Sequence, residues 1–219
     1  MLSKNYFTFF KQLEKNNNKE WFDKNRNTYE TEVKEPFKKL VEAVAAIISA
    51  KDERIDISAG DMIFRINRDI RFSKNKTPYK THMAALISAR GRKNHTHPGY
   101  YMHVEAGKIS LGGGAYFLEP ADLKKVRQEI VYSATEFKKI LNDAAFKKTF
   151  GSIDGEKSKI VPKEFADDVK AQPLILNKQF YFWKDFPIAM AQQKDAPAQM
   201  AKAMLAGKKL NDFLRKALS

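Results

Sequence analysis

The segment from Arg65 to His82 holds the side chains of this sequence that are best suited to bind an anion. It contains six cations, three serine or threonine hydroxyls, a tyrosine and a histidine. Guanidinium groups bind phosphate or carboxylate oxygens in pairs, lysines supply point charges, and hydroxyls complete the shell of donors. The segment therefore predicts a site for an anionic small molecule or a phosphate group, with these candidate ligand-binding residues: Arg65, Arg68, Arg71, Ser73, Lys74, Lys76, Tyr79, Lys80 and His82.

A second pair of residues could transfer protons. His103 and Glu105 alternate with apolar residues in a strand-like pattern, so both should lie on one face of their strand and could act as a general acid and base. The competing interpretation is a hydrogen-bonded pair on a solvated sheet face. His82 is the other candidate proton carrier. The sequence leaves open whether the protein is an enzyme.

The distribution of charge supports an anionic partner. The chain has a net charge of +14, and nine basic residues with a single acid lie between Arg65 and Lys93. A non-catalytic nucleic-acid-binding protein is therefore an alternative, with these cations following a phosphate backbone and Arg90, Arg92 and Lys93 extending the track.

A third interpretation makes the segment a structural clasp in an interaction module. Arg68 and Arg71 would then pair with carboxylates of the opening helices, such as Glu20, Asp23 and Glu32. Two apolar residues inside the basic run, Ile70 and Phe72, predict that the segment packs against the core, where buried cations would need a partner.

The sequence lacks the residues that several kinds of chemistry require. The chain has no cysteine, which excludes disulfides, thiolate nucleophiles and cysteine-ligated metals. Phosphate-binding loop, dinucleotide-binding and nucleophile-elbow motifs are missing. A metal cluster could be built only from His95, His97, His103 and Glu105, a weak pattern, so neither a metal nor a cofactor is predicted.

The periodicity of apolar residues predicts an α+β fold with N-terminal helices, a central antiparallel sheet of four strands or more, and C-terminal helices. Helical spacing covers residues 6–13 and 21–48, with Pro36 as a kink or the start of a new segment. Strand patterns cover 61–67, 81–89, 99–105 and 108–114, the last two forming a hairpin. Further helices are expected at 121–141, 144–150, 197–206 and 208–218.

Two other features each have a structural and a functional interpretation. The triple glycine at 112–114 permits close approach of a ligand or of another backbone, or forms a bulge. The aromatic cluster at 180–186 could stack bases, although core packing is the favoured interpretation. No repeat or linker divides the chain, so a single domain over residues 1–219 is expected.

Four strings of residues resemble the signature blocks of a known family. They are 18–22 (NKEWF), 68–82 (RDIRFSKNKTPYKTH), 99–105 (GYYMHVE) and 112–114 (GGG). They are similar to the domain of unknown function 2461, a family of uncharacterised proteins of about this length. The resemblance implies one α+β domain and no particular activity. It points to the matching positions Trp21, Asn25, Arg26, Arg68, Arg71, Phe72, Ser73, Lys74, Lys76, Pro78, Tyr79, Lys80, His103 and Glu105.

The sequence also carries no membrane or export signal. The first residues lack an apolar export segment, and no window approaches 18 uninterrupted apolar residues. We therefore expect a cytoplasmic protein with no membrane partner.

Overall fold

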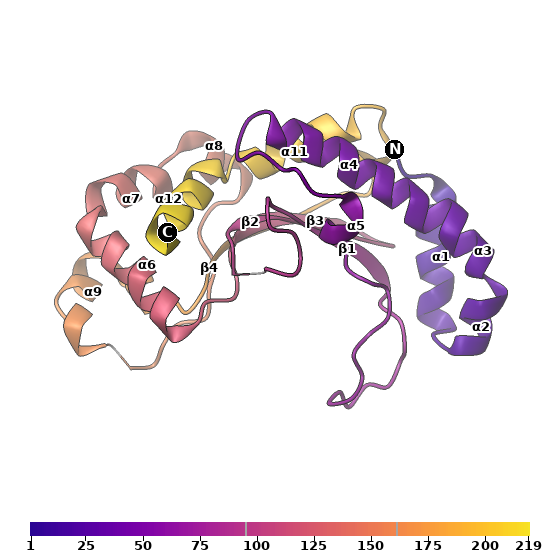
Figure 1. The fold of residues 1–219 in the computed structure, drawn as a ribbon, viewed down its shortest axis with the longest axis horizontal. Coiled ribbons are helices and arrows are strands. Elements are labelled where there is room, and N and C mark those ends of the chain that lie inside the picture. Colours follow the sequence, from indigo (N-terminus) through magenta and orange to yellow (C-terminus); the bar gives the residue numbers. More distant parts are fainter. Residues whose placement is uncertain (95, 161) are drawn as a thin grey trace.

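The centre of the molecule is a four-stranded antiparallel sheet in the order β1-β2-β3-β4. The computed structural model describes residues 1–94, 96–160 and 162–219. The strands are β1 (His82–Ile87), β2 (Gly99–Glu105), β3 (Ile109–Ala115) and β4 (Phe180–Phe186). β1 to β3 follow one another directly, whereas β4 joins the edge of β3 after a long helical insertion (Figure 1).

Alternation along the strands gives the sheet one buried and one open face. In β2, Tyr100, Met102 and Val104 are buried, whereas Tyr101, His103 and Glu105 stay partly exposed. Successive side chains of a strand point to opposite faces, and the pairing of Tyr101 with Leu86 and Gly112 places these three residues on the open face.

Three helices cover the buried face. α4 (Glu35–Ser49) contacts β1, while α11 (Ala196–Leu205) and α12 (Lys208–Leu218) contact β3. Their apolar stripes pack on the sheet; Leu40, Val44, Met200, Met204 and Leu214 are all buried.

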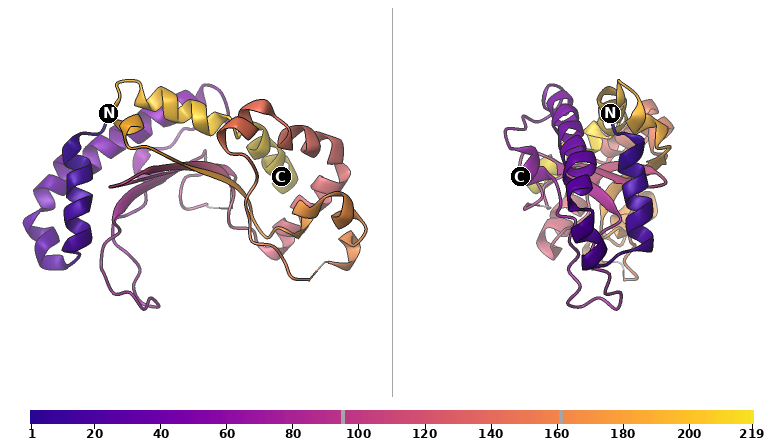
Figure 2. Two further views of the ribbon diagram at one scale, coloured as in Figure 1. Left: turned by 180° about the vertical axis from the view of Figure 1, so that it is seen from behind. Right: turned by 90° about the vertical axis from the view of Figure 1, so that its right-hand side faces the viewer.

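The remaining helices form two limbs beside the open face. One limb consists of α1 (Lys4–Lys15), α2 (Lys19–Lys24), α3 (Arg26–Thr28) and the π-helical turn η1 (Tyr29–Lys34). The other contains α6 (Pro120–Tyr132), α7 (Ala134–Leu141), α8 (Ala144–Thr149) and α9 (Asp168–Ala171), with 3-10 turns at Lys163–Phe165 and Pro173–Leu176. The molecule is therefore an arch with the open face of the sheet on its concave side (Figures 1 and 2).

The helix boundaries follow local sequence signals. The side chain of Asn18 caps α2 by accepting a hydrogen bond from the Trp21 backbone at 2.9 Å. Pro36 lies in the first turn of α4, directly after the π-helical turn, so it begins a new segment. The short helices α5 (Ala59–Met62) and α10 (Ala189–Gln192) complete the fold. Within the described residues, no helix is long and apolar enough to cross a bilayer.

The structure confirms the α+β class, the terminal helices and the antiparallel sheet, but one predicted strand is wrong. Residues 61–67 do not form a strand: Ser58 caps α5, and the chain then pairs only at the isolated bridges Ile63 to Ala85 and Asn67 to Tyr79. The fourth strand is instead β4, within the aromatic cluster. Its dense aromatic run hides the alternation, because Phe180 and Phe182 are buried while Tyr181 and Trp183 are partly exposed.

The triple glycine lets β3 and β4 approach closely. A Cβ at Gly112 would collide with the Phe182 carbonyl oxygen, and one at Gly114 would collide with the Phe180 carbonyl oxygen. Gly114 also has a positive φ of 103°, which side chains rarely tolerate. The close approach is therefore that of a neighbouring backbone.

Gly114→Ala should destabilise the fold by about 1–3 kcal/mol, since the new methyl group both strains φ and pushes β4 away. Gly107→Ala is the matched control, because a Cβ there meets nothing within 4 Å. Urea unfolding of the two variants measures the difference; equal midpoints would contradict this view of the β3 and β4 pairing.

Candidate ligand-binding site on the open sheet face

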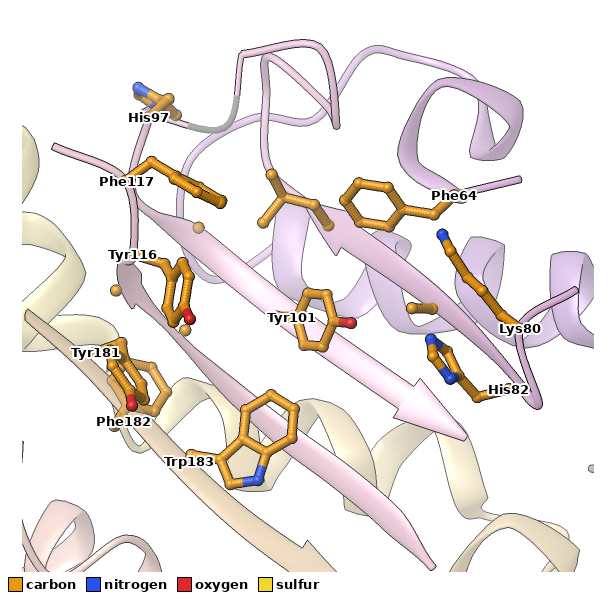
Figure 3. Close-up of a pocket in the computed structure, with 15 residues that line it drawn as sticks. Phe64, Lys80, His82, His97, Tyr101, Tyr116, Phe117, Tyr181, Phe182 and Trp183 are labelled. Carbon is orange, nitrogen blue, oxygen red and sulfur yellow. The ribbon is translucent and has the colours of Figure 1, made fainter. Parts of the chain in front are cut away.

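The concave face of the sheet holds a cavity of about 490 Å³. This volume falls within the range of roughly 300–1,000 Å³ that is typical of small-molecule sites. Figure 3 shows Tyr101 in the middle of the lining, with Phe64, Lys80 and His82 toward one end and Tyr116 and Phe117 toward the other. Five stretches of the chain therefore meet here: Phe64, residues 80–86, residues 97–101, residues 113–117 and residues 181–183.

Aromatic rings make up most of the cavity wall. The rings of Tyr101 and Trp183 lie 5.5 Å apart at 31°, and Phe64 lies 6.2 Å from Tyr101. Tyr116 and Tyr181 pack at 5.2 Å. Burial raises the pKa of the Tyr101 phenol to about 12, so its hydroxyl is a neutral donor. Such a wall suits a flat ring that can stack on Tyr101 or Trp183.

Lys80 supplies a cation at one end of this wall. Its ammonium lies 5.5 Å from the centre of the Phe64 ring. Burial and the nearby Arg65 charge both lower the pKa of Lys80. The cation is thus partly desolvated and has a like charge beside it, and an anionic ligand would relieve both conditions.

A polar groove of about 360 Å³ adjoins the aromatic cavity. Its wall includes Arg68, Thr77 and Thr81, together with Asn17 and Asn75, and one carboxylate, that of Glu14. Lys80 and His82 line both the groove and the cavity. The two spaces therefore meet at these two residues, one offering aromatic faces and the other cations and hydrogen-bond donors.

A loop, residues 65–80, projects between the sheet and the N-terminal limb (Figure 1). We call it the basic arm. Its two sides approach each other as in a narrow hairpin, with backbone hydrogen bonds from Arg68 to Pro78 at 2.9 Å and from Lys80 to Ile66 at 2.8 Å. Side chains brace it further: the Lys76 ammonium donates to the Ile70 carbonyl at 3.0 Å.

The predicted clasp to helix carboxylates is wrong. The Arg68 guanidinium donates to the Thr77 carbonyl at 3.0 Å and to the Ser73 hydroxyl at 3.4 Å. Arg71 forms a double hydrogen bond with Asp69, at 3.0 and 2.7 Å. Glu20 pairs with Lys24 of the same helix and Asp23 pairs with Arg26 at the start of α3. Glu32 accepts hydrogen bonds from Ser3 and Asn5. Arg68 therefore braces the arm from within, whereas Arg71 is held by its neighbour Asp69 and stays exposed.

The expected packing of Phe72 and Ile70 against the core is also wrong. Phe72 is 96% exposed at the tip of the arm, with the Arg71 guanidinium 5.8 Å from its ring centre, and Ile70 is only partly buried. The hairpin carries this stretch away from the sheet, so apolar character did not lead to burial.

The root of the arm, by contrast, is held firmly. The Tyr79 ring stacks on Phe22 of α2 at 4.0 Å and 15°. Asn17 makes two hydrogen bonds with the Tyr79 backbone, donating to its carbonyl at 2.9 Å and accepting from its amide at 3.1 Å. Tyr79, a candidate ligand-binding residue, is thus buried as an anchor.

Three candidate proton carriers lie together beside the cavity. The rings of His82 and His103 stack at 3.8 Å, and His103 Nε2 lies 3.5 Å from Glu105 Oε2. Burial, followed by the nearby His103 and Lys80 charges, lowers the pKa of His82 from its ordinary 6.5 to about 3. Burial also lowers the pKa of His103, against the opposing pull of Glu105. His82 lines the cavity, whereas His103 and Glu105 lie behind it.

This polar cluster continues across the sheet. Ser110 pairs with His103 and with Asp185 in the sheet register, and its hydroxyl donates to the Asp185 carboxylate at 2.6 Å. Lys108 and the Trp183 indole donate to the same carboxylate, at 2.7 and 3.2 Å. One end of the concave face is therefore charged, and it fixes the Trp183 ring against the aromatic end.

The histidines do not assemble a metal site in the part of the chain that the structure describes. His97 lies 2.8 Å from Glu53, and His103 pairs with Glu105 and His82. No group of three or more described His, Asp or Glu side chains could hold an ion. His95, part of the weak metal pattern, lies outside the described residues.

The aromatic wall is the part of the site for which the sequence favoured another interpretation. Trp183 belongs to the aromatic cluster at 180–186, for which core packing was favoured over base stacking, and Tyr101 gave no distinct signal beside Tyr100. Their positions become informative only once β2 and β4 are known to share an open face.

The fold and site together define an α+β protein with a half-covered antiparallel sheet and an aromatic-walled cavity on its open side. A family model described as "Conserved hypothetical protein (DUF2461)" matches residues 5–213. The chain therefore belongs to this family, as its sequence resemblance indicated. No curated protein and no solved structure gives a significant match.

His82 should stay neutral well below pH 6, and its burial should make stability depend on pH. The unfolded chain binds this proton near 6.5 and the folded chain near 3. Between these values the unfolded state holds more protons, so the free energy of unfolding falls as the pH falls. Urea unfolding of wild type and His82→Gln between about pH 4 and pH 7 should show a shallower decline for the variant. Parallel curves would contradict the neutral, buried imidazole.

Asn17→Ala should loosen the root of the basic arm, because it removes both side-chain hydrogen bonds to Tyr79. We expect faster hydrogen exchange of the Tyr79 amide. Asn16→Ala is the control, since the Asn16 amide donates to the Gln12 carbonyl inside the first limb. If both variants leave Tyr79 exchange unchanged, Asn17 is not the anchor.

Proposed function

We propose that the protein binds a small ligand with a flat aromatic ring and an anionic group, either a phosphate or a carboxylate. The ring would occupy the cavity on the open sheet face, and the anion would point toward Lys80 and the polar groove. The observation that carries this proposal is the junction at Lys80 and His82, which line both spaces. Aromatic faces and a partly desolvated cation are thus available to one small molecule.

The expected interaction energies favour such a ligand over a simple anion. Stacking of an aromatic ring on aromatic side chains contributes about 1–3 kcal/mol, and a hydrogen bond to a charged group adds about 1.5–3 kcal/mol. A ligand with both features gains from both ends of the site. Inorganic phosphate would gain only from the Lys80 end.

The same site could also transfer a proton to or from the bound ligand. A neutral His82 imidazole on the cavity wall can accept a hydrogen bond from the ligand, and a bound anion would raise its pKa toward the range in which it accepts a proton. His103 stacks on His82 and pairs with Glu105. This arrangement motivates assigning His103 and Glu105 to acid and base chemistry, with His82 as the residue next to the ligand.

Ligand binding should quench Trp183 and depend on Lys80. In a Trp21→Phe background, Trp183 is the remaining tryptophan, so its fluorescence reports the cavity. Titration with thymidine monophosphate and phenyl phosphate should give saturable quenching, whereas inorganic phosphate should not. Lys80→Met should weaken binding about tenfold or more, and Tyr101→Ala should weaken it about threefold to tenfold or more.

Lys184→Met is the matched control, because Lys184 is an exposed lysine of β4 outside the cavity lining. It should bind as the parent protein does. The proposal fails if no ring-bearing anion quenches Trp183, or if Lys80→Met and Lys184→Met weaken binding equally.

A further inference from the structure

The outer half of the basic arm has features that a small ligand in the cavity would not use. Phe72 is the most exposed large hydrophobic residue of the described chain, at 96%. The Arg71 side chain is 77% exposed, and Lys74 and Lys76 are exposed as well. All four residues lie beyond the arm's root, where Lys80 lines the cavity.

The arm is built to keep these groups in place. Its backbone is paired at Arg68 and Lys80, Arg68 bridges its two sides through Thr77 and Ser73, and Asp69 orients Arg71. Arg71 in turn lies beside the Phe72 ring. A braced projection that presents an aromatic ring among cations is a surface for a partner that is both anionic and aromatic.

A polymeric ligand could contact this surface and the cavity at the same time. Lys80 belongs to both the arm and the cavity wall, so the cations of the arm lead from the cavity to its tip. Single-stranded nucleic acid combines a phosphate at every unit with a base that can stack on an exposed ring. Building on the proposed function, we infer that the cavity ligand is one nucleotide of a single strand, whose backbone follows the basic arm and places another base on Phe72.

The geometry favours a single strand over a duplex or a bilayer. A base can enter the cavity and lie against Tyr101 and Trp183 only if it is unstacked from its neighbours. A flat bilayer could meet the arm tip but not the aromatic wall on the concave side of the arch. The tip also places only one large apolar side chain among cations, which is weak for membrane insertion.

The test compares a fluorescein-labelled oligothymidylate of about twelve nucleotides with thymidine monophosphate. Wild-type protein should bind the oligomer at least about tenfold more tightly than the monophosphate. Its affinity should fall with rising salt, with a log–log slope of about −2 to −3 if three or four phosphates are neutralised. Fluorescence anisotropy measures the oligomer, and Trp183 quenching measures the monophosphate.

Variants of the outer arm separate this inference from the function on which it rests. Phe72→Ala and the double variant Lys74→Ser/Lys76→Ser should each weaken oligomer binding about threefold to tenfold, with monophosphate binding unchanged. The controls are Tyr132→Ala, which removes an aromatic ring that is 87% exposed, and Lys138→Ser/Lys139→Ser on α7, which removes two exposed lysines. Both controls should bind the oligomer as wild type does.

Three outcomes would overturn the inference. If the monophosphate binds but the oligomer binds no more tightly, or the arm variants match their controls, the nucleic-acid track is wrong and the cavity function stands. If the oligomer binds and Tyr101→Ala does not weaken it, no base of the strand occupies the cavity and the inference fails, whereas the cavity function stands or falls with the monophosphate titration. If phosphatidylserine vesicles, and not the oligomer, bind in a manner that requires Phe72, the arm is a membrane anchor.

Discussion

The helices cover only one face of the sheet, and the candidate site depends on this one-sided packing. α4, α11 and α12 bury the side chains of one face, including Tyr100, Met102 and Val104. The opposite face of an antiparallel sheet is usually polar where it meets water. Here it carries Tyr101, Trp183 and Tyr181, half-covered, between the two limbs of the arch. Aromatic surface left open in a concavity is typical of a binding site.

The candidate site also depends on the place where the basic arm joins the sheet. The stacking of Tyr79 on Phe22 and the paired hydrogen bonds of Asn17 fix the arm against the N-terminal limb. This contact sets Lys80 and His82 at the border of the aromatic cavity and the polar groove. The arm's cations differ in role as a result: Arg68 braces the loop, Lys80 faces the site, and Arg71 is presented to solvent.

Local patterns were sufficient to predict the helices, the β2 to β3 hairpin and the position of the basic segment, because each depends on neighbours in sequence. The alternation that placed His103 and Glu105 on one face of β2 is of this kind. The failures depend on distant contacts. β4 could not be recognised before its pairing with the glycine-rich β3, and Phe72 could not be placed without knowing that residues 65–80 leave the sheet as a hairpin. The cavity combines both kinds of missing information, so Tyr101 was not foreseen as part of a site and the aromatic cluster at 180–186 was interpreted mainly as core.

We propose that a ring-bearing anion lies on the open face of the sheet with its charge at Lys80. The most direct measurement is a crystal structure of the protein with bound thymidine monophosphate. We predict electron density for the base over Tyr101 and Trp183 and for the phosphate within hydrogen-bonding distance of the Lys80 ammonium. An empty cavity with the nucleotide bound elsewhere, or a phosphate directed away from Lys80, would contradict the account.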